Sequence, residues 1–302
     1  MSLLRKIYNV LNAVIRRGYW FNNIKFKDCR KLWTYDQFNT EVVNLGSTSG
    51  LHAFDYTDIN AKCANWAISN NPLLGDFAIL KNYVSYLKEG ATVIIPLCPF
   101  SSLAGRYKIS EDRYYSILYP SSIPDFSFRR AQQIKNEMLA PVLSYSFYGF
   151  FLDLKNLIWH NNKILSEDKM RLDSKKWIKD WKREFNISDF SNDLSLVNRD
   201  SILDAIGIIN GMISFCKERN LTPAILIPPV YHTLSTEFND DFQKRILSPL
   251  LDGIEDKFIW YHNYMDDQEF INDCTLFDDS FLLNKKGAKL FTNRVLKDLS
   301  IL

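Results

Sequence analysis

Seven residues near position 47 have the types and the spacing of a nucleophile turn. The segment Asn44–Gly50 is NLGSTSG, so Gly46 and Gly50 flank Thr48 in the frame G-x-S-x-G, with threonine at the serine position. In this frame a strand turns sharply into a helix, and the central hydroxyl lies beside helix N-terminal amides that can stabilise an oxyanion. The segment therefore predicts acyl-transfer chemistry at Thr48. Serine and threonine before a helix are also common N-caps, and this alternative stays open.

A second group of residues lies near the C-terminus, where residues 277–292 are FDDSFLLNKKGAKLFT. The segment resembles the C-terminal block of the SGNH (GDSL-type) hydrolases, in which the catalytic aspartate and histidine occur as D-x-x-H before the last helix. By this resemblance Asp279 is the aspartate, and Leu282 occupies the histidine position. Asn284 and the pair Gly287-Ala288 match the continuation of the block.

With this match, Asn44–Gly50 also resembles the first block of the family, where Gly46 and Ser47 fit and the nucleophile falls on Thr48. Asn65-Trp66-Ala67 resembles the second block, with Ala67 in place of an oxyanion-hole glycine. The G-x-N-D that the family carries after its third strand is absent. The resemblance implies oxyanion or substrate-binding roles for five residues: Gly46, Ser49, Asn65, Ala67 and Asn284.

The strand end at residues 225–229, ILIPP, is similar to SGNH-like proteins of bacterial cell-surface polysaccharide clusters. The resemblance implies an acyl-ester hydrolase or O-acyltransferase that acts on a carbohydrate or another acylated small molecule. It also leaves open a partner enzyme of a polysaccharide pathway.

The two departures from the family pattern argue against an ordinary site, because a leucine cannot accept a proton from a hydroxyl nucleophile. The sequence therefore favours a degenerate or non-standard site. Substitute bases and nucleophiles are available at His52, His232, His262, Ser47 and Ser49. The alternative is a non-catalytic relative, a pseudoenzyme that binds a glycan or a partner protein in the same crevice.

The elements around these residues alternate between strand and helix. Short apolar runs predict strands at 41–45, within 60–67, and at 91–97, 222–228 and 257–261, and apolar residues at helical spacing predict helices at 71–88, 204–218, 242–254 and 285–299. Apolar strands that alternate with helices indicate a parallel sheet covered on both faces. We therefore expect an α/β fold, a doubly wound three-layer α/β/α sandwich with about five parallel strands, SGNH- or flavodoxin-like.

The sequence predicts three parts. Residues 1–40 form an N-terminal helix and lead-in, 41–97 with 198–302 form the α/β domain, and 98–197 form a helical, aromatic-rich insertion. An insertion that follows a strand's carboxyl end lies over the usual ligand crevice, which predicts a lid or docking subdomain. An elaboration that only thickens the core is the alternative.

The composition limits the class of protein. Lys and Arg number 37 against 35 Asp and Glu, and this balance argues against a nucleic-acid binder. The five cysteines and the four histidines, His160 among them, share no metal-ligand spacing, and we find no cofactor motif, so no metal or cofactor is expected. No apolar run is long enough for a membrane span. We expect a cytoplasmic protein, in which the amphipathic, basic segment 1–17 packs on the core or contacts a membrane surface peripherally.

Overall fold

The computed structural model describes residues 3–302 except 108, 110 and 159–165. The chain divides into two compact units. The sheet unit comprises Gln37–Lys108 and Ile164–Leu302, and the helical unit comprises Met1–Asp36 and Ile109–Lys163. Residues 98–197, which the sequence analysis treats as one insertion, therefore contribute to both units.

The sheet unit contains one parallel sheet of five strands in the order β2-β1-β3-β4-β5. The strands are β1 Thr40–Asn44, β2 Cys63–Asn65, β3 Leu87–Pro96, β4 Thr222–Ile227 and β5 Trp260–Asn263. The predicted α/β fold with five parallel strands is confirmed. This strand order is the flavodoxin-like one. In sheets of this order the ligand crevice forms beyond the carboxyl ends of β1 and β3, because the strand order reverses between these two strands.

The fifth strand begins three residues later than the sequence predicts. Asp256 forms a turn whose side chain accepts a hydrogen bond from the Phe258 amide at 3.2 Å, and its carbonyl accepts one from the Ile259 amide at 3.3 Å. The predicted bounds of this strand were therefore wrong, because the apolar run in the sequence does not reveal that its first residues form a turn. As a consequence His262 lies within β5 rather than after it.

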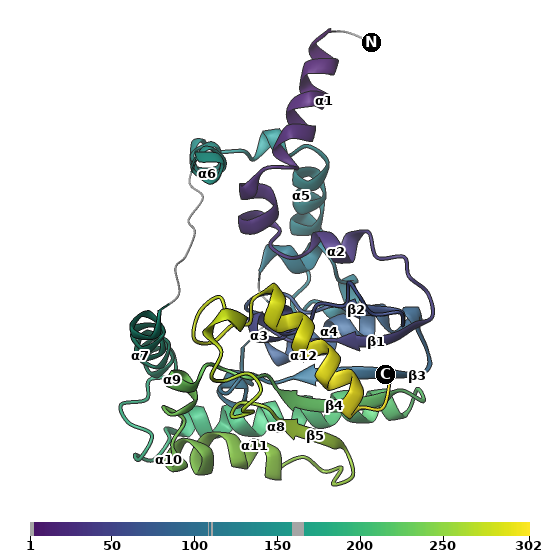
Figure 1. Cartoon of the computed structure of the whole chain (residues 1–302). Helices are drawn as coiled ribbons and strands as arrows, with labels where there is room; N and C mark the ends of the chain where they lie inside the picture. Colours follow the sequence, from purple (N-terminus) through teal and green to yellow (C-terminus); the bar gives the residue numbers. More distant parts are fainter. Residues whose placement is uncertain (1–2, 108, 110, 159–165) are drawn as a thin grey trace. The chain divides into compact units, whose positions relative to one another are not determined.

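Helices cover both faces of the sheet (Figure 1). The helices of the sheet unit are α3 Thr48–Ala53, α4 Leu73–Tyr83, α7 Glu167–Glu184, α8 Leu196–Lys217, α9 His232–Ser235, α10 Asp240–Phe242, α11 Ser248–Asp252 and α12 Lys285–Asp298. Short 3-10 or π-helical turns add η2 Val84–Tyr86, η3 Ser101–Ala104, η7 Gln243–Leu247 and η8 Cys274–Leu276.

Alternate strand residues point to opposite faces of the sheet, and this alternation divides the core. On one face Val42, Ile94 and Leu226 belong to a buried cluster with Ala53 of α3 and with Phe291 and other residues of α12. The opposite face is covered by α4 and α8, which contact each other. α3 and α12, which come from the two ends of the sheet unit's sequence, therefore pack against the same face of the sheet.

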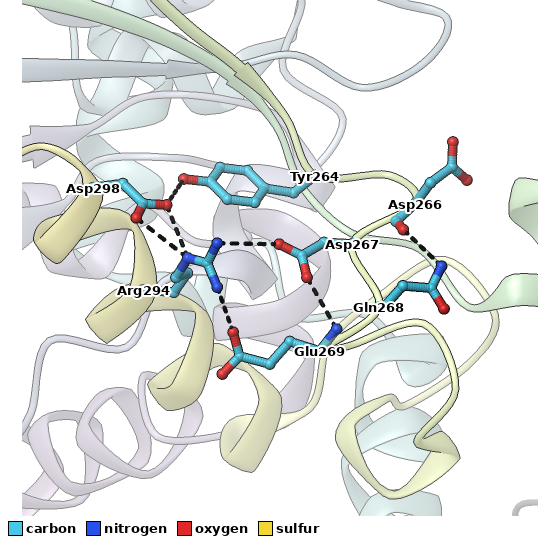
Figure 2. Close-up of polar contacts among 7 residues, drawn as sticks. All are labelled: Tyr264, Asp266, Asp267, Gln268, Glu269, Arg294 and Asp298. Atoms are coloured by element: carbon cyan, nitrogen blue, oxygen red, sulfur yellow. Dashed lines mark hydrogen bonds and ion pairs between the residues drawn. The ribbon is translucent and has the colours of Figure 1, made fainter.

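The segment after β5 is tied to α12 by one arginine (Figure 2). Arg294 forms ion pairs with Asp298 at 3.0 Å, Glu269 at 2.8 Å and Asp267 at 3.8 Å, and the Tyr264 hydroxyl donates to Asp298 at 2.6 Å. Isolated surface ion pairs contribute little, but a network that shares one guanidinium restrains several backbone segments together. The network thus fixes the start of the segment 264–284 that carries Asp279.

The helical unit is built around two chain segments that are far apart in the sequence. Its elements are α1 Leu3–Ile15, η1 Trp20–Lys25, α2 Arg30–Trp33, η4 Asp112–Ser116, η5 Pro120–Ser122, α5 Phe128–Leu139, η6 Pro141–Leu143 and α6 Phe147–Ile158. Lys25 bridges the two segments through ion pairs with Glu137 at 2.7 Å and Asp112 at 3.7 Å. Among the helices that the structure describes, none combines the length and the apolar character needed to cross a bilayer.

Candidate functional site

The turn between β1 and α3 has the geometry that the two glycines predict. Gly46 adopts φ of +116°, and a Cβ there would lie 3.2 Å from the Gly50 Cα. A Cβ on Gly50 would lie 2.7 Å from the Leu45 carbonyl oxygen, closer than real Cβ contacts come. The sharp strand-to-helix turn therefore depends on glycine at both positions, and it places Thr48 at the first position of α3, beyond the carboxyl end of β1.

Two asparagines on adjacent strands stabilise the turn through side-chain hydrogen bonds to its backbone. The Asn44 side-chain amide donates to the carbonyls of Leu45 at 3.0 Å and Gly50 at 3.2 Å, and to Asn65 Oδ1 at 3.2 Å. The Asn65 amide donates in turn to the carbonyls of Leu51 and Phe54, both at 3.1 Å. Asn65 thus connects α3 to β2 through hydrogen bonds, which is a structural role. The resemblance implies an oxyanion or binding role for the same residue.

A buried aspartate that the sequence analysis does not single out lies directly behind the turn. Asp76, on α4, is 2% exposed, and its Oδ1 accepts hydrogen bonds from the Gly46 amide at 3.0 Å and from the Asn71 side chain. Burial raises the pKa of Asp76 to about 7, and the two hydrogen bonds oppose the shift only in part. An acidic residue in the first turn of a helix is ordinarily a surface partner of the helix dipole, so the sequence gives no signal for this burial.

The Thr48 hydroxyl is hydrogen-bonded to Asn70, in the loop between β2 and α4. Its Oγ1 donates to Asn70 Oδ1 at 3.2 Å and accepts from the Asn70 amide at 3.1 Å. Thr48 is half-buried, so it remains accessible. The hydroxyl of Thr48 therefore donates its proton to an amide side chain, which is not a base.

The side chains of the C-terminal block stabilise its own backbone. Asp279 Oδ1 accepts hydrogen bonds from the amides of Phe281 and Leu282, both at 2.9 Å, and Leu282 is 9% exposed. Asn284 caps α12 by accepting from the amides of Lys286 at 2.9 Å and Gly287 at 3.1 Å. Asp279 thus closes a turn in the position where the resemblance implies that it orients a histidine.

The two blocks nevertheless meet. His52, one helical turn after Thr48, places Nδ1 3.9 Å from Asp278 Oδ2. The Ser280 carbonyl accepts the Tyr231 amide at 2.9 Å, and Tyr231 follows the carboxyl end of β4. The nucleophile turn and the D-x-x-L segment therefore lie at the same edge of the sheet.

The other candidate histidines are engaged elsewhere. His232 begins α9 and places Nε2 3.1 Å from Glu167 Oε1 on α7. His262 is exposed on β5, where its ring lies 4.1 Å from that of Tyr264. His160 lies outside the described residues. Of the three described histidines, only His52 contacts the C-terminal block.

The alternative nucleophiles Ser47 and Ser49 and the oxyanion candidate Ala67 all lie at or near the turn after β1 or β2. Ser47 stands at the N-cap position of α3, and its side chain makes no capping hydrogen bond. Ser49 is 5% exposed, and within the described part of the chain its hydroxyl has no hydrogen-bond partner. The amide of Ala67 donates to Asn65 Oδ1 at 3.1 Å, so this amide is not available as an oxyanion donor in the present geometry.

Part of the predicted insertion packs on the C-terminal block. On α7, Trp177 and Trp181 lie 5.1 Å and 5.0 Å from the Phe281 ring, and Asp173 accepts hydrogen bonds from the Ser280 amide and hydroxyl. Phe100, another aromatic of the predicted insertion, is 1% exposed in the core of the sheet unit. α7 thus supports the segment that carries Asp279.

This arrangement brings the nucleophile turn and the C-terminal block to one edge of the sheet, but it does not have the hydrogen bonds of a standard proton path. Among the residues that the structure describes, the Thr48 hydroxyl is hydrogen-bonded to Asn70 and Asp279 Oδ1 accepts from two backbone amides, so these groups do not have the arrangement of a catalytic triad. The pair of His52 and Asp278 is the nearest substitute for the missing base. Over the described residues, no three histidine, cysteine or acidic side chains come together as a metal site.

Comparison of the sequence with protein-family models finds no match, and comparison with proteins of curated function finds none. The resemblance to the SGNH hydrolases therefore depends on the residues of the sequence blocks alone.

Proposed function

We propose that this chain is an SGNH hydrolase-like protein of bacterial cell-surface polysaccharide metabolism, with a non-standard site for acyl-ester hydrolysis or O-acyl transfer. The observation that carries the proposal is the contact of His52 with Asp278, at 3.9 Å. It joins the helix of the nucleophile turn to the segment that resembles the family's Asp-His block. An acylated carbohydrate is the proposed substrate.

In the catalytic form of the proposal the Thr48 hydroxyl attacks the ester carbonyl. His52 takes the hydroxyl proton and passes it to the leaving alcohol, and Asp278 stabilises the protonated imidazole. Water or a second sugar hydroxyl then releases the acyl group. Residues four positions apart lie on the same face of a helix, so Thr48 can exchange its bond to Asn70 for one to His52 after a side-chain rotation.

The second candidate function is binding without catalysis, and a specific observation favours it. Oδ1 of Asp279 accepts hydrogen bonds from two amides of its own turn, and Leu282, at the position where the family has its histidine, is buried. In this form the same edge of the sheet binds a glycan or a partner enzyme, and no covalent intermediate forms.

Turnover of p-nitrophenyl acetate and labelling with a fluorophosphonate separate the two forms. We expect slow wild-type turnover that falls about a hundredfold or more in both Thr48→Ala and His52→Gln, the range typical of a lost general base. His262→Gln, a histidine exposed on β5, is the matched control and should leave turnover unchanged. Turnover that survives Thr48→Ala would exclude the catalytic form as stated.

Restoration of the family residues gives an independent test. The pair Thr48→Ser with Leu282→His should raise hydrolysis above either single substitution, because nucleophile and base act as a unit. The gain should stay partial, since one missing oxyanion donor costs on the order of a hundredfold. Hydrolysis equally high in one of the single variants would show that the assigned positions do not form a pair.

A further inference from the structure

The N-terminal helix of the helical unit exposes a wide apolar face. Leu3, Leu4 and Val14 are 73%, 79% and 62% exposed. The exposed apolar residues of the helix are Leu3, Leu4, Ile7, Tyr8, Val10, Leu11 and Val14. At 3.6 residues per turn they span an arc of about 160°. This arc is wider than the two-position seam through which one helix pairs with another in a coiled coil.

The same segment carries only positive charge. Residues 1–17 contain four basic residues and no acidic residue, whereas the whole chain is nearly balanced at +2. Lys6 and Arg17 are exposed. An amphipathic helix with basic residues beside a broad apolar face is typical of helices that lie in a membrane interface.

A second exposed apolar face lies on α6, in the same unit. Phe147 is 85% exposed and Leu157 is 74% exposed. Five further apolar residues of the helix are exposed: Tyr148, Phe150, Phe151, Leu154 and Ile158. Aromatic rings are favoured at the level of lipid headgroups, where one side is apolar and the other is wet.

The opposite side of α6 is packed inward. A Cβ on Gly149 would lie 3.0 Å from the Trp20 ring, so the helix approaches η1 closely there. Asp153, the only acidic residue of α6, accepts hydrogen bonds from the Trp20 amide and the Tyr145 hydroxyl, both at 2.6 Å. The exposed face of α6 therefore carries no acidic group.

The last turn of α1 holds that helix on the helical unit. Asn12 is 3% exposed and its Oδ1 accepts from the Val142 amide at 3.0 Å, and Arg16 donates to the Met138 carbonyl at 3.2 Å. The earlier turns extend beyond the rest of the unit (Figure 1). Both apolar faces thus belong to one compact unit, although they come from distant parts of the sequence.

We infer that the helical unit docks on the surface of an anionic membrane through α1 and α6. The apolar arc of α1 and the aromatic residues of α6 enter the boundary between headgroups and acyl chains, while Lys6 and Arg17 contact anionic headgroups. A second copy of the chain fits this surface less well, because the two copies would bring their basic segments together. The inference is independent of the proposed function.

Co-sedimentation with lipid vesicles tests the inference on the full-length protein. The protein should bind phosphatidylcholine vesicles that contain about one third phosphatidylglycerol, and bind phosphatidylcholine alone much more weakly. Lys6→Gln with Arg17→Gln should lower the partition coefficient about twenty-five-fold, since each basic residue near an anionic surface contributes about fivefold. Added salt should have a similar effect.

Apolar substitutions test the second half of the surface. Leu4→Ser and Phe147→Ser should each reduce binding about tenfold, the loss of one large apolar side chain from the interface. Phe258→Ser is the matched control, because Phe258 is 98% exposed but lies in the sheet unit. It should leave vesicle binding unchanged.

Three outcomes would overturn the inference. The first is no binding to anionic vesicles by folded protein, and the second is equal binding to vesicles with and without phosphatidylglycerol. The third is concentration-dependent self-association in analytical ultracentrifugation that Leu4→Ser and Phe147→Ser abolish, which would assign the surface to a second copy of this chain.

Discussion

The buried carboxyl of Asp76 should make the stability of the protein fall as the pH rises toward neutrality, and Asp76→Asn should remove this dependence. The carboxyl is 2% exposed, and burial raises its pKa from 3.8 to about 7. An asparagine has nearly the same shape, and its side-chain oxygen can still accept the hydrogen bond from the Gly46 amide. The substitution therefore removes the titration and keeps the principal contact.

The sign follows from the number of protons bound in each state. Between pH 3.8 and about 7 the folded Asp76 retains its proton, while the unfolded chain has lost it, so stability falls with rising pH. The full difference between the two pKa values corresponds to about 4 kcal/mol. Of this, about 2 kcal/mol is lost between pH 5 and pH 7. Above pH 7 both states are ionised, and the loss levels off.

The assay is urea unfolding of the wild type and Asp76→Asn at several pH values between 5 and 8. The wild type should lose about 2 kcal/mol relative to the variant over the lower two units of that range. Asp252→Asn, which makes the same chemical change on the exposed surface, controls for the altered net charge. A difference that does not vary with pH, or a wild type that gains stability as the pH rises, would show that Asp76 is ionised in the folded protein.

Two further substitutions test the turn and the cap, again by urea unfolding. Gly46→Ala should destabilise by about 1–3 kcal/mol, because φ of +116° is strained for a residue with a side chain. The control Gly207→Ala, on α8 with open space around the new Cβ, should stabilise by up to about 1 kcal/mol, and equal effects would contradict the assigned strain. Asn284→Ala should lower the free energy of unfolding by about 1–2 kcal/mol, because it removes the cap of α12. Asn284→Asp keeps the cap and loses only the hydrogen bonds that Asn284 donates to carbonyls, so it should lower the free energy of unfolding less. An aspartate as damaging as alanine would assign the role to the donated bonds.

The features that the sequence predicts well are the local ones. The strands β1, β3 and β4 are short apolar runs, and α12 starts at an asparagine cap whose partners are two and three residues away. Such patterns depend on neighbours along the chain, so no knowledge of the tertiary structure is needed. The five-stranded parallel sheet follows from these runs and from their alternation with helices.

The features that the sequence does not predict depend on contacts between distant segments. The helical unit joins residues 1–36 to residues 109–163, and no periodicity or turn signal marks that pairing. The burial of Asp76 is equally hard to predict, because it results from contact with the turn after β1, thirty residues earlier in the chain. Asn70 is a loop residue by type, and only the fold brings it to Thr48.

The hydrogen bonds of Asp279 explain why the D-x-x spacing alone cannot diagnose a catalytic site. The aspartate accepts from the backbone amides of Phe281 and Leu282, and every residue except proline supplies such an amide. The turn therefore closes whatever side chain stands at position 282. Catalysis needs in addition an imidazole that can reach the nucleophile, and here the imidazole that pairs with the neighbouring Asp278 belongs to His52, on α3. The proposed catalytic activity therefore requires the pair of His52 and Asp278 to act on the Thr48 hydroxyl, and the comparison of His52→Gln with His262→Gln tests this requirement.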